Sequence, residues 1–263
     1  MKAVGIILAG GNSEMRLGDL TAFRAAAAMP VGGSYRAIDF PLTSMTASGI
    51  GKIAVITQYN SRSLHDHLVS SKWWDLGRKK GGLFVFSPYT SMDNSSWFRG
   101  TADSIYQNLT FLQRSNEPYV VIASGDSVYK MNFKKVIEYH VAKGADLTIV
   151  YKNIENEDLS KYGVMQMDED KRVIDFEEKP LEPVGHSVSL GTYVIGREML
   201  IDLLETIIAE GRYDFVRDIL IRYKNLKRIY GYKIDSYWSN ISTVESYYKT
   251  NMDFLKPEIR NYF

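Results

Sequence analysis

The sequence predicts an α/β protein with a doubly wound, mostly parallel (Rossmann-like) sheet and extra antiparallel strands in its second half. Several short segments are apolar without alternation, which is typical of strands buried on both faces of a parallel sheet. Segments with helical spacing lie between them. Strand, helix, strand and helix follow one another over the first 150 residues. This order is that of a doubly wound sheet.

The elements of the first half follow from these apolar runs. The predicted buried strands are Ala3 to Leu8, Ile53 to Thr57, Tyr119 to Ser124 and Leu147 to Tyr151. A helix is expected over Thr101 to Gln113, where Ala102, Ile105 and Leu109 share one face. A second helix is expected over Phe133 to Lys143. The alanine tract Ala25 to Ala28 is interpreted as a helix end.

The second half has shorter polar turns between its apolar segments. Strands are expected at Gly163 to Met167, Val173 to Phe176 and Val188 to Ile195, followed by a helix from Arg197 to about Glu210. These strands are expected to add to the sheet in mixed or antiparallel fashion. No Pro/Gly/Ser-rich linker separates the halves, so we expect one continuous domain over residues 1–263.

Composition excludes several classes of protein. The 263 residues are 45% hydrophobic and carry a net charge of +1, so nothing favours disorder or nucleic-acid binding through bulk charge. The absence of cysteine excludes disulfides, thiolate catalysis and Cys-based zinc sites. No apolar run approaches the roughly 20 residues of a membrane span. The opening MKAVGIILAGG lacks the cleavage pattern of a signal peptide. We therefore expect a cytoplasmic protein with neither nucleic-acid nor membrane partners.

The turn after the first strand is the first candidate site. Leu8, Ala9, Gly10 and Gly11 leave a buried strand, and Arg16 follows. Backbone N–H groups at such a turn can approach a phosphate, and an arginine can clamp the same anion. The turn matches neither the P-loop nor the dinucleotide-binding pattern. A structural glycine turn remains the alternative.

Two further candidates carry charge at strand ends. Asp126 follows a buried strand at its carboxyl edge, where open α/β sheets bind ligands, and it could hold Mg²⁺ beside a phosphate. Lys179, between Glu178 and Pro180, could neutralise a sugar phosphate. The alternatives are a turn-capping aspartate and a solvated charge cluster.

Ten motifs in order along the chain resemble a known family. They run from LAGG through YRAIDFPLTS, IAVITQY, FRGTADSIYQNL, SGDSVYKMNF, YGVM, FEEKP, SLGTYVI and DFVRDIL to YWSNISTVESYY. The succession resembles the nucleotidyltransferase domain of bacterial ADP-glucose pyrophosphorylase, the glucose-1-phosphate adenylyltransferase of glycogen synthesis. The resemblance implies a fold of the sugar-nucleotidyltransferase type. It also implies the reaction of ATP with glucose 1-phosphate to give ADP-glucose and pyrophosphate.

The resemblance implies a role for each matching residue. Nucleotide binding falls to Leu8, Ala9, Gly10, Gly11, Gly100, Thr101 and Ala102. Sugar-phosphate binding falls to Tyr162, Gly163, Glu178, Lys179 and Ser189. The catalytic positions are Arg16, Asp126 and Lys179, with Asp126 as the ligand of Mg²⁺ if the chain is active.

Three departures from the family pattern concern charge. The triphosphate loop GGNSEMRL is one residue longer than the family's and contains Glu14. The family's phosphate-binding lysine is Ala26 here, and its second metal-binding aspartate is Asn240. Ser127 also replaces the usual histidine after the catalytic aspartate.

This loss of charge resembles the noncatalytic D-type subunit that accompanies the catalytic subunit in firmicutes. The expected protein is thus a regulatory subunit with weak or no activity, which forms a hetero-oligomer with a catalytic subunit. The alternatives are an active adenylyltransferase in which Arg24 or Lys130 replaces the lysine, and a sensor that binds ATP or ADP-glucose. Family members continue into a C-terminal left-handed β-helix that this sequence lacks, and we expect a truncation.

Overall fold

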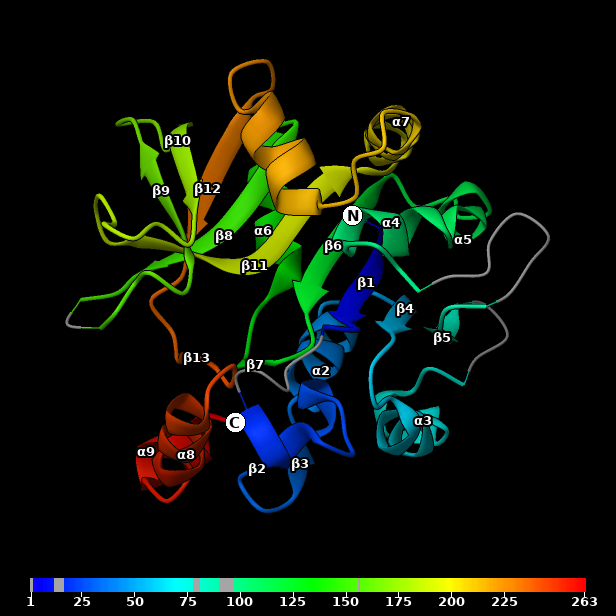
Figure 1. Cartoon of the computed structure of the whole chain (residues 1–263), viewed down its shortest axis with the longest axis vertical. Helices are drawn as coiled ribbons and strands as arrows, with labels where there is room; N and C mark the ends of the chain where they lie inside the picture. The colour runs from blue at the N-terminus through cyan, green and yellow to red at the C-terminus, as the bar shows by residue number, and fades with distance from the viewer. Residues whose placement is uncertain (1, 12–16, 78–80, 90–96, 156) are drawn as a thin grey trace. The chain divides into compact units, whose positions relative to one another are not determined.

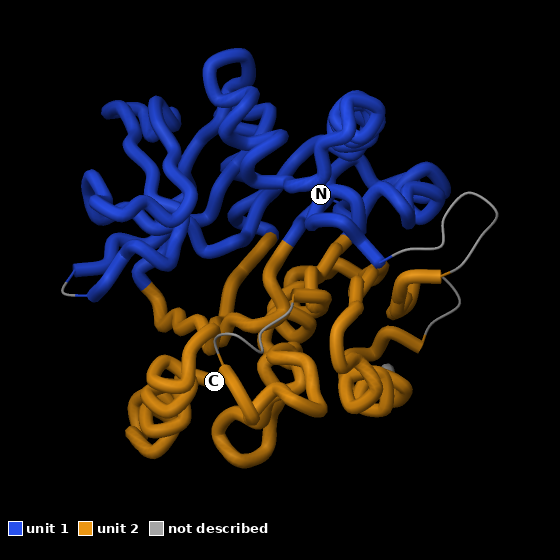
Figure 2. Tube along the Cα trace, viewed as in Figure 1, with its two compact units in different colours: residues 1–4, 96–122, 134–235 blue, residues 5–95, 123–133, 236–263 orange. Residues whose placement is uncertain are grey.

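The structure, a computed structural model, describes residues 2–11, 17–77, 81–89, 97–155 and 157–263 (Figure 1). Two compact units are built from discontinuous stretches of chain (Figure 2). Unit 1 holds residues 1–4, 96–122 and 134–235, and unit 2 holds residues 5–95, 123–133 and 236–263. Strands β1 (Ala3–Ala9) and β6 (Tyr119–Ser124) each begin in unit 1 and end in unit 2.

Parallel strands form the sheet of unit 2. The end of β1 pairs in parallel with β4 (Lys52–Thr57), with Gly5 opposite Ile53. Strand β4 pairs in parallel with β5 (Gly82–Phe86). Nearly every side chain of β1 and β4 is buried, because both strands consist of apolar residues that need cover on both faces. The helices of this part are α2 (Asp39–Ala47) and α3 (Arg62–Leu68), with 3₁₀ turns η1 (Gly18–Thr21), η2 (Ala26–Ala28) and η3 (Ser71–Trp74).

Two small ribbons and two helices complete unit 2. The antiparallel ribbons are β2 (Pro30–Val31) with β3 (Tyr35–Arg36), and β7 (Ser127–Tyr129) with β13 (Trp238–Asn240). They are followed by α8 (Val244–Asp253) and α9 (Pro257–Tyr262). Helix α8 begins with a capping box between Thr243 and Ser246. A hydrophobic cluster joins these parts, comprising Met29, Val31, Ala37, Phe40, Val128, Ile241 and Phe254.

Unit 1 has a mixed sheet. Its strands are β8 (Leu147–Asn153), β9 (Gly163–Met167), β10 (Val173–Glu178), β11 (Ser187–Gly196) and β12 (Ile229–Lys233). Strand β11 runs antiparallel to β6, β8 and β9; β9 and β10 form a hairpin, and β12 is parallel to β8. The helices are α4 (Thr101–Tyr106), α5 (Leu109–Gln113), α6 (Phe133–Ala142), α7 (Arg197–Ala209) and the π-helical η4 (Val216–Ile221).

The predicted α/β class is confirmed, including the antiparallel strands of the second half. The prediction of one continuous helix over Thr101 to Gln113 is wrong, because this segment forms two short helices, α4 and α5. Asn108 separates them with φ −110° and ψ 22°, and its side-chain amide donates to the Ser104 carbonyl at 2.9 Å. Such local hydrogen bonds compete with a regular helix. The tract Ala25 to Ala28 is also corrected, since η2 is a separate 3₁₀ turn preceded by an extended Ala25.

Membrane-spanning helices are absent from the described part of the chain: none there has the length and apolar character to cross a bilayer.

Candidate functional site

The glycine turn after β1 packs closely in unit 2. A Cβ atom on Gly10 would lie 3.2 Å from the Cβ of Gln58, so little room exists for a side chain. The Leu8 carbonyl accepts a hydrogen bond of 2.9 Å from the amide of Gly125. Hence Gly10 and the residue before Asp126 both adjoin the end of β1. Gly11 is exposed, and Arg16 lies outside the described residues, as do all residues from 12 to 16.

Ala26 lies close to this strand end as part of η2. Its side chain is 5% exposed, and a Cβ on Gly125 would lie 3.1 Å from that of Ala9 and 3.3 Å from that of Ala27. The η2 turn, the end of β1 and the Gly125 turn therefore meet in one place. We call Leu8–Gly11, Ala26–Ala28, Asp126 and Asn240 the strand-end cluster. Alanine at position 26 gives this place no cation.

Asp126 and Asn240 are directly hydrogen-bonded across the β7–β13 ribbon. The Asn240 Oδ1 atom accepts from the Ser242 backbone N–H at 2.8 Å, which fixes the orientation of the amide. Its Nδ2 atom therefore donates to Asp126 Oδ1 at 3.2 Å and to Ser127 Oγ at 3.3 Å. The Ser124 hydroxyl also donates to Asp126 Oδ1. Asp126 is thus a half-buried carboxylate held by neutral donors.

These residues do not fit a magnesium ion held between two carboxylates. Mg²⁺ takes oxygen ligands, and the atom of Asn240 that faces Asp126 is an N–H donor. The amide oxygen of Asn240 is already engaged by Ser242. In the described part of the chain, no group of three or more His, Asp or Glu side chains is placed to hold a metal ion.

Two cations were predicted as replacements for the missing lysine. Lys130 is occupied elsewhere: its Nζ donates to the Tyr262 carbonyl at 2.9 Å and lies 5.3 Å from the centre of the Tyr262 ring. The Tyr262 hydroxyl donates in return to the Lys130 carbonyl at 3.0 Å. Arg24 is exposed, two residues before Ala26.

The predicted sugar-phosphate residues gather at the β9–β10 hairpin of unit 1. Gly163 opposes Glu178 in the ladder, and the Lys179 amide donates to the Tyr162 carbonyl at 3.0 Å. Gly163 has no room for a side chain, because a Cβ there would lie 2.4 Å from Phe176 Cζ and 3.0 Å from Glu178 Oε2. Lys179 has φ +51°, a left-handed conformation, and its Nζ lies 3.8 Å from Glu178 Oε1.

Strand β11 adds Ser189 to this group. Val188 pairs with Val164 of β9, which brings β11 beside the hairpin. Ser189 is 8% exposed, and its Oγ atom accepts a hydrogen bond from the Gly191 backbone N–H at 3.4 Å. Burial raises the pKa of Tyr193 well above its usual range, so this phenol stays neutral. We call Tyr162, Gly163, Glu178, Lys179 and Ser189 the hairpin cluster.

Glu178 is the titratable group of the hairpin cluster that the environment perturbs. Burial raises its pKa, and the negative charge of Asp214 raises it further. Lys179 and Arg217 act in the opposite direction. The cluster therefore combines a carboxyl group, the Lys179 cation and hydroxyl groups, with Arg217 as a neighbouring cation, and this set suits recognition of a phosphorylated sugar.

The sequence analysis did not identify three residues near the hairpin cluster: Asp214, Tyr193 and Arg217. Their signal was present in the motifs SLGTYVI and DFVRDIL, from which we assigned only Ser189. The predicted nucleotide residues Gly100, Thr101 and Ala102 lie at the start of α4, also in unit 1.

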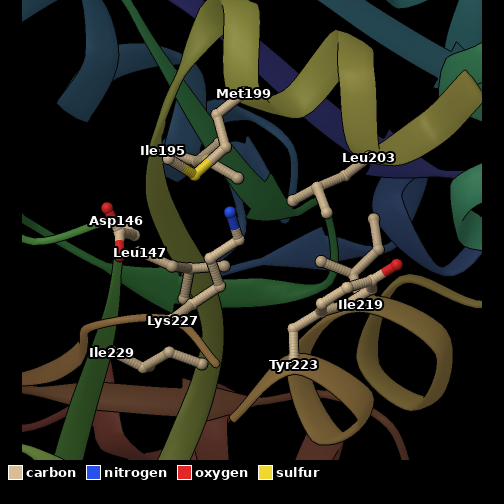
Figure 3. Close-up of a pocket in the computed structure, with 9 residues that line it drawn as sticks. All are labelled: Asp146, Leu147, Ile195, Met199, Leu203, Ile219, Tyr223, Lys227 and Ile229. Carbon is tan, nitrogen blue, oxygen red and sulfur yellow. The ribbon is translucent and has the colours of Figure 1, made fainter. Parts of the chain in front are cut away.

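A cavity in unit 1 is separate from all these residues. Figure 3 shows apolar side chains from β11, α7 and η4 around it, with the Lys227 side chain extending among them. Its volume is about 10 Å³, room for about one water molecule. The cavity is too small for a sugar or a nucleotide.

Comparison with known proteins identifies relatives across most of the sequence. The chain is 41% identical over 258 residues to a glucose-1-phosphate adenylyltransferase of Thermotoga maritima. The aligned segment covers 97% of this chain and 61% of the relative. Enzymes of the same name from Clostridium perfringens (strain 13) and Geobacillus stearothermophilus are 40% and 37% identical. These matches cover 97% of this chain and 65% and 66% of the relatives. The chain thus spans less than two thirds of their length.

A family model described as nucleotidyl transferase matches residues 4–257, nearly the whole chain. The chain therefore belongs to the nucleotidyl transferase family.

Proposed function

We propose that the chain is a regulatory subunit of a glucose-1-phosphate adenylyltransferase, with weak or no activity of its own. The observation that carries this proposal is the hydrogen bond from Asn240 to Asp126. At this place the family resemblance leads one to expect two carboxylates around Mg²⁺. The buried Ala26, where the resemblance leads one to expect a lysine, supports the same conclusion.

The loss of the lysine and of the second carboxylate is expected to have a large effect on the rate of catalysis. Two unit charges 4 Å apart interact by roughly 4 kcal/mol at an effective dielectric constant of about 20. Each tenfold change in rate corresponds to about 1.4 kcal/mol. Removal of one lysine and one metal-binding carboxylate is therefore expected to lower the rate by several orders of magnitude, even when the two effects are not additive.

The hairpin cluster supports retained binding of a ligand. Lys179 and Glu178 keep the charges that a sugar phosphate requires, and Ser189 lies on β11, the strand that pairs with the hairpin. The expected ligands are ATP, glucose 1-phosphate and ADP-glucose. A subunit of this kind would report ligand levels to its catalytic partner and alter the partner's output.

Two other functions remain testable. An active adenylyltransferase could use Arg24, which is exposed, in place of the missing lysine. A sensor without a partner would bind ADP-glucose through the hairpin cluster alone.

The decisive experiment is co-expression with a catalytic subunit of the same family. We expect a complex by gel filtration and a higher rate of ADP-glucose formation than the catalytic subunit gives alone. Failure to associate, or an unchanged rate in the mixture, would contradict the regulatory function. Turnover by the isolated chain would establish the active enzyme. Calorimetric binding of ADP-glucose by a chain that forms no complex would establish the sensor.

A further inference from the structure

The hydroxyl group of Thr101 joins two parts of unit 1 that are far apart in sequence. Its Oγ1 atom accepts a hydrogen bond from the Phe215 backbone N–H at 2.9 Å and donates to Asp214 Oδ2 at 3.3 Å. The Ala102 backbone N–H donates to the Tyr213 carbonyl at 2.9 Å. The turn that begins α4 and residues 213–215 therefore form one hydrogen-bonded structure.

Arg99 also connects the start of α4 to Tyr213. Its guanidinium group lies 3.8 Å from the centre of the Tyr213 ring, and its Nη1 donates to the Tyr213 hydroxyl at 2.7 Å. Its Nη2 donates to Asp103 Oδ1 at 3.0 Å, and Asp103 is fully buried. A Cβ on Gly100 would lie 2.3 Å from the Tyr213 carbonyl oxygen, so the backbones approach as closely as glycine allows. A stacked, multiply bonded arginine holds its partners more rigidly than a lysine would.

Both oxygens of Asp214 are held by this arrangement. The Oδ1 atom accepts from the Arg217 backbone N–H at 2.8 Å, and the Oδ2 atom accepts from Thr101. The carboxylate is half-buried, and the ring of the next residue, Phe215, packs against Tyr193 of β11 with 5.1 Å between the ring centres. Strand β11 carries Ser189 of the hairpin cluster, and the negative charge of Asp214 raises the pKa of Glu178. The orientation of Asp214 therefore depends on the turn at Gly100 and Thr101.

We propose that Thr101 and Arg99 are positioning residues that hold Asp214 beside the hairpin cluster, so that a ligand at the Gly100 turn and a sugar phosphate at the cluster alter each other's affinity. The identity of the two ligands rests on the proposed function. The positioning itself rests on the hydrogen bonds of unit 1. By linkage, the effect of either ligand on the other is the same in size.

Calorimetry on the full chain, with glucose 1-phosphate as the probe, tests the positioning. Thr101→Val is expected to weaken binding about tenfold, as loss of one hydrogen bond to a charged group does. Thr101→Ser keeps the hydroxyl and is expected to recover most of that loss. Thr206→Val is the matched control, because it removes a threonine hydroxyl that donates to the Asp202 carbonyl within α7. It is expected to bind within about twofold of the unmodified chain.

The pH profile of binding separates positioning from a general loss of structure. Since Asp214 helps to raise the pKa of Glu178, loosening Asp214 is expected to move the profile of Thr101→Val toward lower pH. Thr206→Val is expected to keep the original profile. Titration with ATP present is expected to change glucose 1-phosphate affinity in the unmodified chain and much less in Thr101→Val.

Three results would overturn the proposal: equal affinity and profile in Thr101→Val and the unmodified chain, equal weakness in the Val and Ser variants, or no effect of ATP on the unmodified chain. If the unmodified chain binds no glucose 1-phosphate, the proposed function fails, and amide hydrogen exchange decides the positioning. Faster exchange over residues 213–217 in Thr101→Val but not in Thr101→Ser then supports it. Unchanged exchange overturns it.

Discussion

Asn240 presents an amide N–H to the Asp126 carboxylate, with 3.2 Å between Nδ2 and Oδ1. The orientation of the amide is set by the backbone N–H of Ser242, which can only donate. A neutral donor therefore stands opposite Asp126. The hydrogen bond joins Asp126 to the β7–β13 ribbon, because it pairs a carboxylate with a donor rather than with a second carboxylate.

Restoring both charges should restore part of an enzyme's activity. We expect Ala26→Lys with Asn240→Asp to give measurable ADP-glucose formation, because the pair returns a cation and a second carboxylate to the strand-end cluster. Either change alone should give little. The rate should stay well below that of a catalytic subunit, because the GGNSEMRL loop is unchanged and Ala26 is buried. A pyrophosphate-release assay measures the result.

The control for this variant is Ala26→Lys with Asn225→Asp, which makes the same change in charge at an exposed asparagine. It should remain inactive. A double variant that binds ATP without turnover would assign the defect to the loop. Full activity of the unmodified chain would contradict the regulatory function.

Asn240→Asp alone should make stability depend on magnesium. Two carboxylates would then face each other at hydrogen-bond distance, and like charges so close repel. We expect a lower melting temperature than that of the unmodified chain, with recovery on addition of millimolar Mg²⁺. Differential scanning calorimetry measures both. Asn225→Asp should melt like the unmodified chain with or without the ion, and an equal response of the two variants would refute the explanation.

His140 should make the fold sensitive to acid. Burial lowers its pKa from 6.5 to about 4, and its Nδ1 lies 2.9 Å from the hydroxyl of the buried Thr148. The unfolded chain therefore takes up this proton first as pH falls. The stabilisation is complete above about pH 6.5 and is lost between that pH and about 4, by roughly 3 kcal/mol.

Urea unfolding at pH 4.5 and pH 7 measures this loss. His140→Gln should reduce the difference in unfolding free energy between the two pH values. His186→Gln, which removes an exposed histidine, is the matched control. The assignment to His140 is wrong if both variants keep the full difference.

Gly163→Ala should disturb the hairpin cluster through packing. The added Cβ would lie 2.4 Å from the Phe176 ring and 3.0 Å from the Glu178 carboxylate. We expect a loss of about 1–3 kcal/mol in stability, as overpacking usually costs, together with weaker glucose 1-phosphate binding. Gly196→Ala is the control, since its nearest neighbour would be 3.9 Å away and its φ is −62°. Equal melting temperatures for the two variants would contradict this account.

Buried strands were the easiest part of the fold to predict. Tyr119–Ser124 and Gly163–Met167 were predicted with their observed bounds, because continuous or alternating apolar residues report burial directly. The break at Asn108 was missed, since it depends on one side-chain hydrogen bond that competes with the helix. The β7–β13 ribbon was also missed, because its strands have three residues each and pair across a long stretch of sequence.

The sequence predicted which residue types make up the candidate site, but it could not predict which side chains contact one another. The sequence indicated that Asn240 is neutral, yet only the structure shows its amide hydrogen on Asp126. It gave Lys130 as a substitute cation and could not reveal the contact with Tyr262. Asp214 was not singled out because its relation to Glu178 depends on how separate segments of unit 1 come together.

The interleaved composition of unit 2 has a consequence for its biosynthesis. The amide of Gly32 donates to the side chain of Asn251, 219 residues later, and Phe40 packs against Phe254. At about 5–20 residues per second, the ribosome takes roughly 10–40 seconds to make the chain between the first and the last part of this unit. Its early apolar surface, including Val31 and Phe40, stays uncovered during that interval. Newly made chains should accordingly depend on chaperones that shield such surface until synthesis is complete.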